Sequence, residues 1–102
     1  MIFLLDLRDA ESGEIVGKLV DASLEKLVVL SDRAFDVYRK YQFALGLTSR
    51  GNAETFTLSA RCLWSREEDN SGFYLNGLEV TEKSPENIRG LQNLVERYVP
   101  EQ

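Results

Sequence analysis

The sequence predicts a mostly β fold in which six antiparallel strands are followed by one C-terminal amphipathic α-helix. Two observations predict it. Short apolar runs alternate with turn residues as far as residue 80, and the strong helix signal comes only after that point. A chain of 102 residues can bury one hydrophobic core, so we expect a single domain over residues 1–102. The hydrophobic content of 43% and the charged content of 28% are typical of folded globular chains.

The six strands are expected where apolar and β-branched residues lie between turn residues. They span about residues 2–8, 15–21, 24–30, 41–48, 54–65 and 72–80. Gly17 inside the second strand indicates a bulge or the tight bend that a barrel needs at a corner. The fifth strand places on one face Phe56, Leu58, Ala60, Cys62 and Trp64. We therefore expect Trp64 to be substantially buried where that strand ends.

The sixth strand carries a polar residue where an apolar one is expected. Asn76 falls on the face that should point inward, whereas Leu75 falls on the alternate face. Either Asn76 is buried and hydrogen-bonded, or the register slips by one residue and Leu75 points inward. Outward positions for Leu63 and Leu75 would form a small apolar patch. Such a patch is either a partner surface or a pair of ordinary surface leucines.

The C-terminal helix is expected over residues 85–98. Ser84 is a suitable N-cap, Pro85 fits the first helical position, and Glu86 lies where the helix dipole favours an acid. Apolar residues then recur at helical spacing: Ile88, Leu91, Leu94, Val95 and Tyr98. Pro100 ends the pattern.

Charge and residue types exclude several classes of function. The net charge of −5 disfavours binding to nucleic acid or to anionic membranes. With no histidine and a single cysteine, Cys62, the chain lacks the residues for a zinc site or a histidine-dependent nucleophile. We expect no enzyme activity, no metal and no cofactor. Neither a signal peptide nor a membrane-spanning stretch is visible, and Cys62 fits a core thiol, so we expect a cytoplasmic protein.

Three segments carry a resemblance to a known family. Gly17 to Leu30 contains an Asp-x-Ser at Asp21 and Ser23, Ala60 to Trp64 ends a long strand, and Tyr74 to Val80 carries a central glycine. Their order and spacing resemble the PilZ domain, a small bacterial β-barrel that binds cyclic diguanylate (c-di-GMP). The resemblance extends from about Gly13 to Tyr98. It implies a split six-stranded barrel with a C-terminal helix, and a role in bacterial motility, pilus or exopolysaccharide control.

The sequence departs from the PilZ pattern at the residues that would bind the dinucleotide. PilZ domains that bind c-di-GMP carry an Arg-x-x-x-Arg pair and an Asp/Asn-x-Ser-x-x-Gly turn. Here no two arginines stand four apart, and Lys26 occupies the glycine position. Lys26 adds bulk where a ligand would approach, and it lacks the planar fork of arginine. If c-di-GMP binds, the resemblance implies contacts from Arg8, Asp21, Ser23 and Lys26, although Asp21 and Ser23 also suit a plain turn.

Three hypotheses follow from the sequence. The chain is a PilZ-like signalling adaptor that does not bind c-di-GMP and contacts a protein through the face at Asp21 to Lys26, together with Arg8 and either Arg61 or Arg66. Alternatively, it is a c-di-GMP receptor whose arginine motif lies outside these residues or is replaced. The third hypothesis is a structural domain that oligomerises, for instance through the C-terminal helix. The sequence leaves open the partner, the pathway and the oligomeric state.

Overall fold

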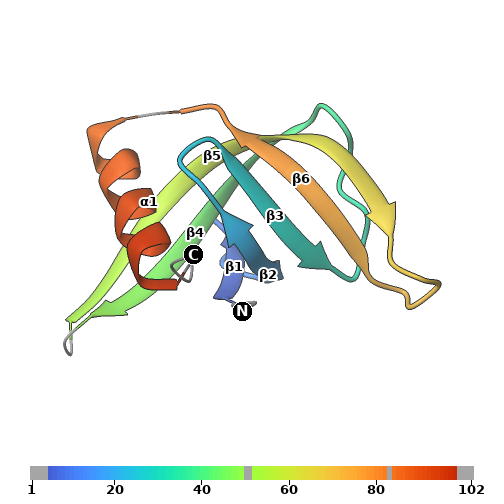
Figure 1. Ribbon diagram of the computed structural model, residues 1–102, viewed down its shortest axis with the longest axis horizontal. Helices are drawn as coiled ribbons and strands as arrows, with labels where there is room; N and C mark the ends of the chain where they lie inside the picture. The colour runs from blue at the N-terminus through green and yellow to red at the C-terminus, as the bar shows by residue number, and fades with distance from the viewer. Residues whose placement is uncertain (1–4, 50–51, 83, 99–102) are drawn as a thin grey trace.

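A closed barrel of six antiparallel strands with one helix packed against it makes up the computed structural model, which describes residues 5–49, 52–82 and 84–98 (Figure 1). The elements are β1 (Leu5–Asp9), β2 (Ile15–Ala22), β3 (Lys26–Ser31), β4 (Lys40–Ser49), β5 (Asn52–Glu67), β6 (Tyr74–Val80) and α1 (Pro85–Tyr98). Around the barrel the strands follow the order β1-β2-β3-β6-β5-β4. The predicted fold class is therefore confirmed.

Two strands begin later than the sequence predicted. β3 begins at Lys26 instead of Leu24, because residues 23–25 form the turn that leads into it. β6 begins at Tyr74 instead of residue 72, because Gly72 has a φ of 81° and belongs to the preceding turn. Of the first predicted strand, residues 2–4 lie outside the described residues, and β1 extends to Asp9. The hairpin of β4 and β5 is longer than predicted. The pairing runs from Lys40 with Arg61 to Ser49 with Asn52, and β5 continues to Glu67.

Gly17 lies at a bulge, as its position in the sequence predicted. Leu7 pairs with Gly17 and Arg8 pairs with Ile15, so one residue of β2 has no partner in β1. A Cβ atom at position 17 would lie 2.7 Å from the carbonyl oxygen of Leu30. Glycine is thus required by the close approach of β3 to the bulged strand.

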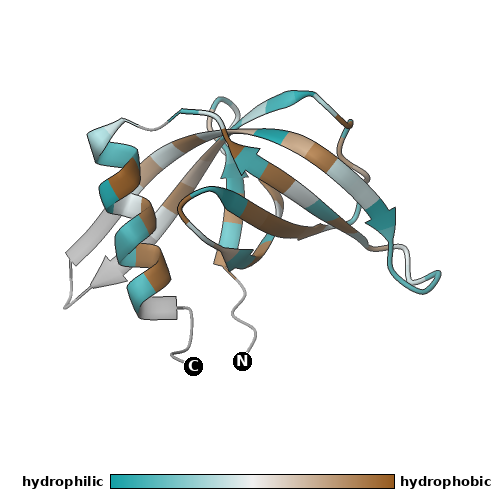
Figure 2. Cartoon of the chain, turned by 45° about the horizontal axis from the view of Figure 1, so that its top comes forward, coloured by the Kyte–Doolittle hydropathy of each residue, from teal (hydrophilic) through white to brown (hydrophobic). Residues whose placement is uncertain are grey.

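The core lies inside the barrel and under the helix. Its buried apolar side chains come from all six strands and from α1, and the largest are Phe43, Leu7, Leu19, Leu27, Leu45, Leu58, Leu78, Leu91 and Leu94. Figure 2 shows hydrophobic and hydrophilic residues alternating along the strands, as expected where one face points inward.

Trp64 is 41% exposed, so the prediction that it is substantially buried is wrong. Leu58, Ala60 and Cys62 do point inward. The alternation then breaks, because Cys62 pairs with Leu78 and Trp64 pairs with the next residue of β6, which leaves Leu63 as an extra residue. One extra residue reverses the faces of the strand beyond it. Trp64 therefore lies on the outer face.

Asn76 is fully buried and the register of β6 does not slip. Its Oδ1 accepts hydrogen bonds from the Phe35 amide (3.1 Å) and the Ser65 hydroxyl (2.7 Å). Its Nδ2 donates to the Val29 carbonyl (3.1 Å) and the Ser31 hydroxyl (2.8 Å). The first of the two alternatives for Asn76 is correct. The side chain joins β3, β5 and β6 to the connection that follows β3.

The helix is capped and docked as the sequence predicted. The Ser84 hydroxyl accepts from the Asn87 amide (3.2 Å), and the Ser84 carbonyl accepts from the Ile88 amide (2.9 Å). Leu91 and Leu94 are buried. α1 packs mainly against β5 (Figure 1), where a Cβ at Gly90 would lie 2.7 Å from the Phe56 ring.

Candidate functional site

The turn from Asp21 to Lys26 uses its polar side chains to hold its own backbone. Oδ1 of Asp21 accepts from the Ala22 amide (2.9 Å). The Ser23 hydroxyl accepts from the amides of Glu25 (3.3 Å) and Lys26 (3.1 Å). The Ser23 amide in turn donates to the Lys26 carbonyl (2.8 Å). These hydrogen bonds are the ones expected if Asp21 and Ser23 are turn residues.

Arg8 lies far from this turn. It pairs with Ile15 at the start of β2, whereas Lys26 follows the turn after Ala22 at the end of β2. At about 3.3 Å per residue, the seven steps from Ile15 to Ala22 along the bulged strand span at most about 23 Å. Arg8 donates instead to the Gly13 carbonyl (2.8 Å). The structure therefore does not bring Arg8 together with Asp21, Ser23 and Lys26, and the sequence-based grouping of Arg8 with this face is corrected.

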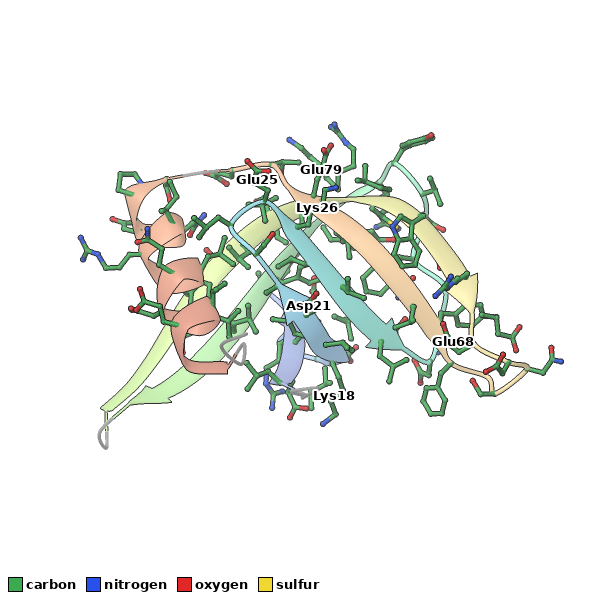
Figure 3. The ribbon with its side chains drawn as sticks, viewed as in Figure 1. Lys18, Asp21, Glu25, Lys26, Glu68 and Glu79 are labelled. Carbon is green, nitrogen blue, oxygen red and sulfur yellow. The ribbon has the colours of Figure 1, made fainter. Side chains whose placement is uncertain are left out.

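Lys26 belongs instead to a row of charged side chains across four neighbouring strands. Lys26 pairs with Glu79, Glu79 with Arg61, and Arg61 with Lys40. The residues that follow or precede them, such as Leu27, Ala60 and Leu78, are buried, so the row lies on the outer face. Figure 3 shows Lys26 and Glu79 close together at one end of the barrel, away from Lys18.

This cationic row, defined by Lys26, Arg61 and Lys40 around Glu79, carries three cations and one carboxylate. The closest approach of Arg61 Nη1 to Glu79 Oε1 is 4.0 Å, at the limit of an ion pair, and both side chains are more than 40% exposed. Within the described residues, Lys26 and Lys40 are exposed and make no ion pair. The row itself is net positive on a chain whose net charge is −5, and Glu25 beside Lys26 and Glu82 beside Lys40 border it (Figure 3).

Trp64 lies next to the cationic row on the outer face. A Cβ at Gly77 would lie 2.1 Å from Nε1 of the indole, so the ring covers this glycine. The Arg66 guanidinium lies 5.6 Å from the centroid of the Trp64 ring, a cation–π distance. Leu75 is on the same face, pairs with Leu30 and Arg66, and is partly buried. An outer apolar surface thus adjoins the row, and Leu75 belongs to it.

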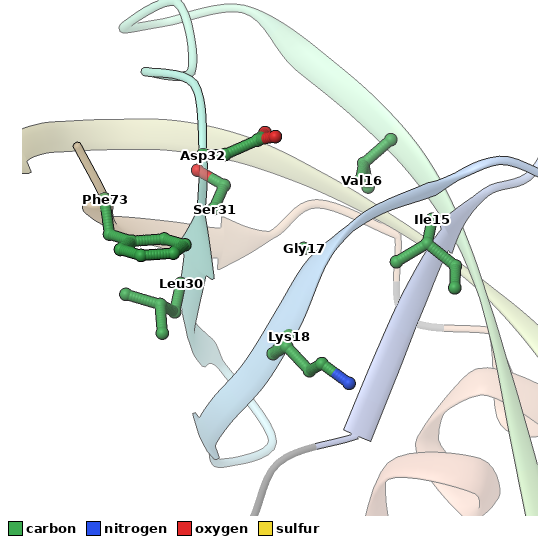
Figure 4. A pocket seen from close by; sticks show the side chains of 8 residues that line it. All are labelled: Ile15, Val16, Gly17, Lys18, Leu30, Ser31, Asp32 and Phe73. Atoms are coloured by element: carbon green, nitrogen blue, oxygen red, sulfur yellow. The ribbon is translucent and has the colours of Figure 1, made fainter.

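A shallow pocket lies where β2 and β3 separate (Figure 4). Its volume is about 210 Å³, and its lining residues are Ile15, Val16, Gly17, Lys18, Leu30, Ser31, Asp32 and Phe73. This volume lies below the roughly 300–1,000 Å³ usual for small-molecule sites. Larger open hollows lie elsewhere, of about 430 Å³ beside Lys40 and Glu82 and of about 410 Å³ beside Arg8 and Lys18.

Three ionisable groups have displaced pKa values. The hydrogen bond and the charge of Lys18, with Nζ 2.5 Å from Oδ1, lower the pKa of Asp6. The amide of Ser12, followed by its side chain, lowers the pKa of Asp9. Burial raises the pKa of the Cys62 thiol. The buried Cys62 is thus a weak nucleophile in the folded chain.

The described residues contain no cluster of side chains that could hold a metal ion. The one described helix, of 14 residues, is not long and apolar enough to cross a membrane.

Comparison with known proteins supports the fold. No protein-family model matches the sequence, and no curated protein matches it. The structure is similar to that of the Bacillus subtilis inhibitor of motility MotI/DgrA, with a TM-score of 0.75 and 16% sequence identity. The match covers 98% of this chain and 49% of that protein, so the chain spans about half its length. The six-stranded barrel with its C-terminal helix is a PilZ-like fold.

The sequence did not identify the cationic row. Lys26, Lys40 and Arg61 are far apart along the chain, and their meeting depends on the strand order β3-β6-β5-β4. One signal was available: each of the three flanks an inward-facing apolar residue, and so is expected on an outer face. Which outer residues become neighbours follows only from the pairing of the strands.

Proposed function

We propose that this chain is a non-enzymatic PilZ-like adaptor domain that contacts a protein partner through the cationic row and does not bind c-di-GMP. The single observation that carries the proposal is the cationic row itself. It is an outward surface with two lysines that make no ion pair with any described residue, beside a turn whose polar side chains are already engaged with their own backbone. Exposed charges of this kind contribute little to stability and are suited to steering a partner.

The loss of dinucleotide binding is argued from the geometry around Lys26. A receptor for c-di-GMP needs donors for the guanine edges and phosphates, and arginine forks supply both. Arg8 has no second arginine four residues away in the sequence. It lies in β1, beside the end of β2 that is far from Lys26. Arg61 lies beside Glu79, which competes for its guanidinium. No arginine pair therefore converges on the turn within the described residues.

The similarity to MotI/DgrA favours a role in the control of motility. That protein is described as an inhibitor of motility, and its structure contains a region with this fold. We place the adaptor in a bacterial cytoplasm, where one buried cysteine and no disulfide are expected.

Affinity capture, in which the full chain is isolated from cells that express it and the bound protein is measured, tests the proposal. The double variant Lys26→Glu/Lys40→Glu reverses two exposed charges that have no ion-pair partner in the described part of the chain, so we expect an unchanged fold and at least a tenfold loss of captured partner. Arg89→Glu reverses an exposed charge on α1 and is the matched control. Capture that survives the double reversal, or that is lost with Arg89→Glu instead, contradicts the proposal.

A further inference from the structure

Tyr38 occupies a backbone position that normally belongs to glycine. Its φ is 72°, in the left-handed region that bulky residues rarely adopt. The Tyr38 amide donates to the Cys62 carbonyl (2.7 Å), while the Cys62 amide donates to the carbonyl of Arg39 (3.0 Å). Two residues therefore oppose one residue of β5. This is the pattern of a G1 bulge, whose first residue is usually glycine.

The side chain of Tyr38 does not compensate for this strain within the described part of the chain. It is 74% exposed, the most exposed of the large hydrophobic residues described. Its hydroxyl makes no hydrogen bond, and its ring makes no ring contact, with any described residue. A strained residue whose side chain supports nothing in the fold points to a function outside the fold. Val37, the preceding residue, is also 46% exposed.

The bulge at Tyr38 lies beside the bulge that exposes Trp64. Tyr38 and Arg39 oppose Cys62 on one side of β5, and Leu63 is the extra residue on the other side. Tyr38 opposes Cys62, two residues before Trp64, so the two exposed aromatic residues stand at neighbouring positions of the sheet, with the Trp64 ring over Gly77 of β6. Figure 1 shows this connection running beside β5 at the end of the barrel opposite α1. Tyrosine and tryptophan are the residue types most often found at the centre of protein contacts.

The neighbouring charges decide the chemistry of the partner. Arg61 immediately precedes Cys62, and Lys40 is two residues from Tyr38, so the cationic row borders the aromatic pair. Arg66 lies over the Trp64 ring but pairs with Glu68 (3.3 Å), and Arg39 pairs with Asp36 (3.3 Å), so Lys40 and Arg61 are the cations left to meet a partner's acidic groups. Glu79 is the one carboxylate in the row. A segment that places apolar side chains on the aromatic pair would gain from acidic residues beside them.

We propose that Tyr38 and Trp64 bind an apolar segment of a partner protein that carries Asp or Glu residues against Lys40 and Arg61. This inference rests on the proposed adaptor function and specifies the partner's chemistry. It also gives Tyr38 a role that separates binding from stability. Replacement by glycine relieves the left-handed backbone and removes the contact at once.

Selection of displayed random peptides on the full chain tests the inference without a known partner. We expect enriched peptides to combine aromatic or aliphatic residues with Asp or Glu. The best peptide, made synthetically, should bind Tyr38→Gly and Trp64→Ala at least about tenfold more weakly. Its affinity should fall with added salt. Phe73→Ala, which removes another half-exposed aromatic on the opposite side of β6, is the matched control and should bind as the wild type does.

Thermal unfolding provides the second readout. Tyr38→Gly should melt at the same temperature as the wild type or higher, since the strain is relieved. A lower melting temperature would give Tyr38 a structural role and overturn the inference. So would the absence of enriched peptides, peptides without acidic residues, or unchanged affinity for Tyr38→Gly. Self-association that Tyr38→Gly abolishes would identify a second copy as the occupant and also overturn it.

These outcomes are distinct from failure of the adaptor function. If captured partner is lost with Lys26→Glu/Lys40→Glu but not with Tyr38→Gly, the adaptor function stands and the role of Tyr38 is wrong. If neither variant affects capture, both proposals fail.

Discussion

Replacement of Asn76 tests the buried polar network that joins β3, β5 and β6 to the connection after β3. Asn76→Ala removes four hydrogen bonds at once: two that Oδ1 accepts and two that Nδ2 donates. The site is inaccessible to water, since Asn76 is fully buried. The partners that lose their bonds must therefore find others or remain unsatisfied.

The magnitude follows from the number of bonds. At a net value of about 1 kcal/mol for each hydrogen bond, Asn76→Ala should lower the free energy of unfolding by about 4 kcal/mol. That is a large part of the roughly 5–15 kcal/mol typical of a domain. The melting temperature of a chain of this size should fall by about 15–30 °C. Ser65→Ala removes one of the bonds and should cost about 1 kcal/mol.

Chemical denaturation followed by circular dichroism measures the loss. Gln92→Ala removes an exposed amide from α1 and is the control, with an expected change within about 0.5 kcal/mol. Hydrogen exchange at the Phe35 amide should accelerate selectively in Asn76→Ala, because that amide donates to Oδ1. A loss below about 1 kcal/mol would refute the account of Asn76 as the centre of this network.

Two further predictions concern Trp64 and Asp6. Trp64→Ala should cost about 2 kcal/mol, less than the 3–5 kcal/mol of a fully buried aromatic, because the indole is partly exposed. Gly77→Ala places a Cβ against the indole and should shift Trp64 fluorescence to longer wavelength. If the losses in free energy of unfolding caused by Gly77→Ala and Trp64→Ala are fully additive in the double variant, the contact is contradicted. The lowered pKa of Asp6 contributes stability that is present above the ordinary value of 3.8 and is lost as the pH falls through the lowered pKa. Melting temperatures measured below pH 3.8 should therefore fall less steeply for Asp6→Asn than for the wild type, and parallel curves would show that the ion pair with Lys18 is absent.

Strand alternation was sufficient to predict most of the barrel interior. Leu58, Ala60 and Cys62 point inward because a period of two places them on one face. The same rule failed for Trp64, because the single extra residue Leu63 leaves no trace in an apolar sequence. A buried asparagine was recognised as an irregularity, but its partners Ser65 and Phe35 come from elements that only the fold brings together.

The surface was less predictable than the core. The sequence grouped Arg8 with Lys26 through a family resemblance, and strand register places them at opposite ends of β2. Lys40 and Lys26 belong to one row only because the barrel orders their strands as β3-β6-β5-β4. The conformation of Tyr38 carries no sequence signal either, since glycine, the residue that would announce a left-handed position, is absent there.

Titration calorimetry of residues 1–102 with c-di-GMP tests the central claim most directly. The claim is that a PilZ-like barrel works here through a protein-binding surface instead of a nucleotide site. Because Lys26 stands in the glycine position and no arginine pair converges on the turn within the described residues, we predict no binding tighter than the high-micromolar range. The melting temperature should likewise be unchanged by the ligand. A stoichiometric isotherm in the low-micromolar range would contradict the account and identify the chain as a dinucleotide receptor.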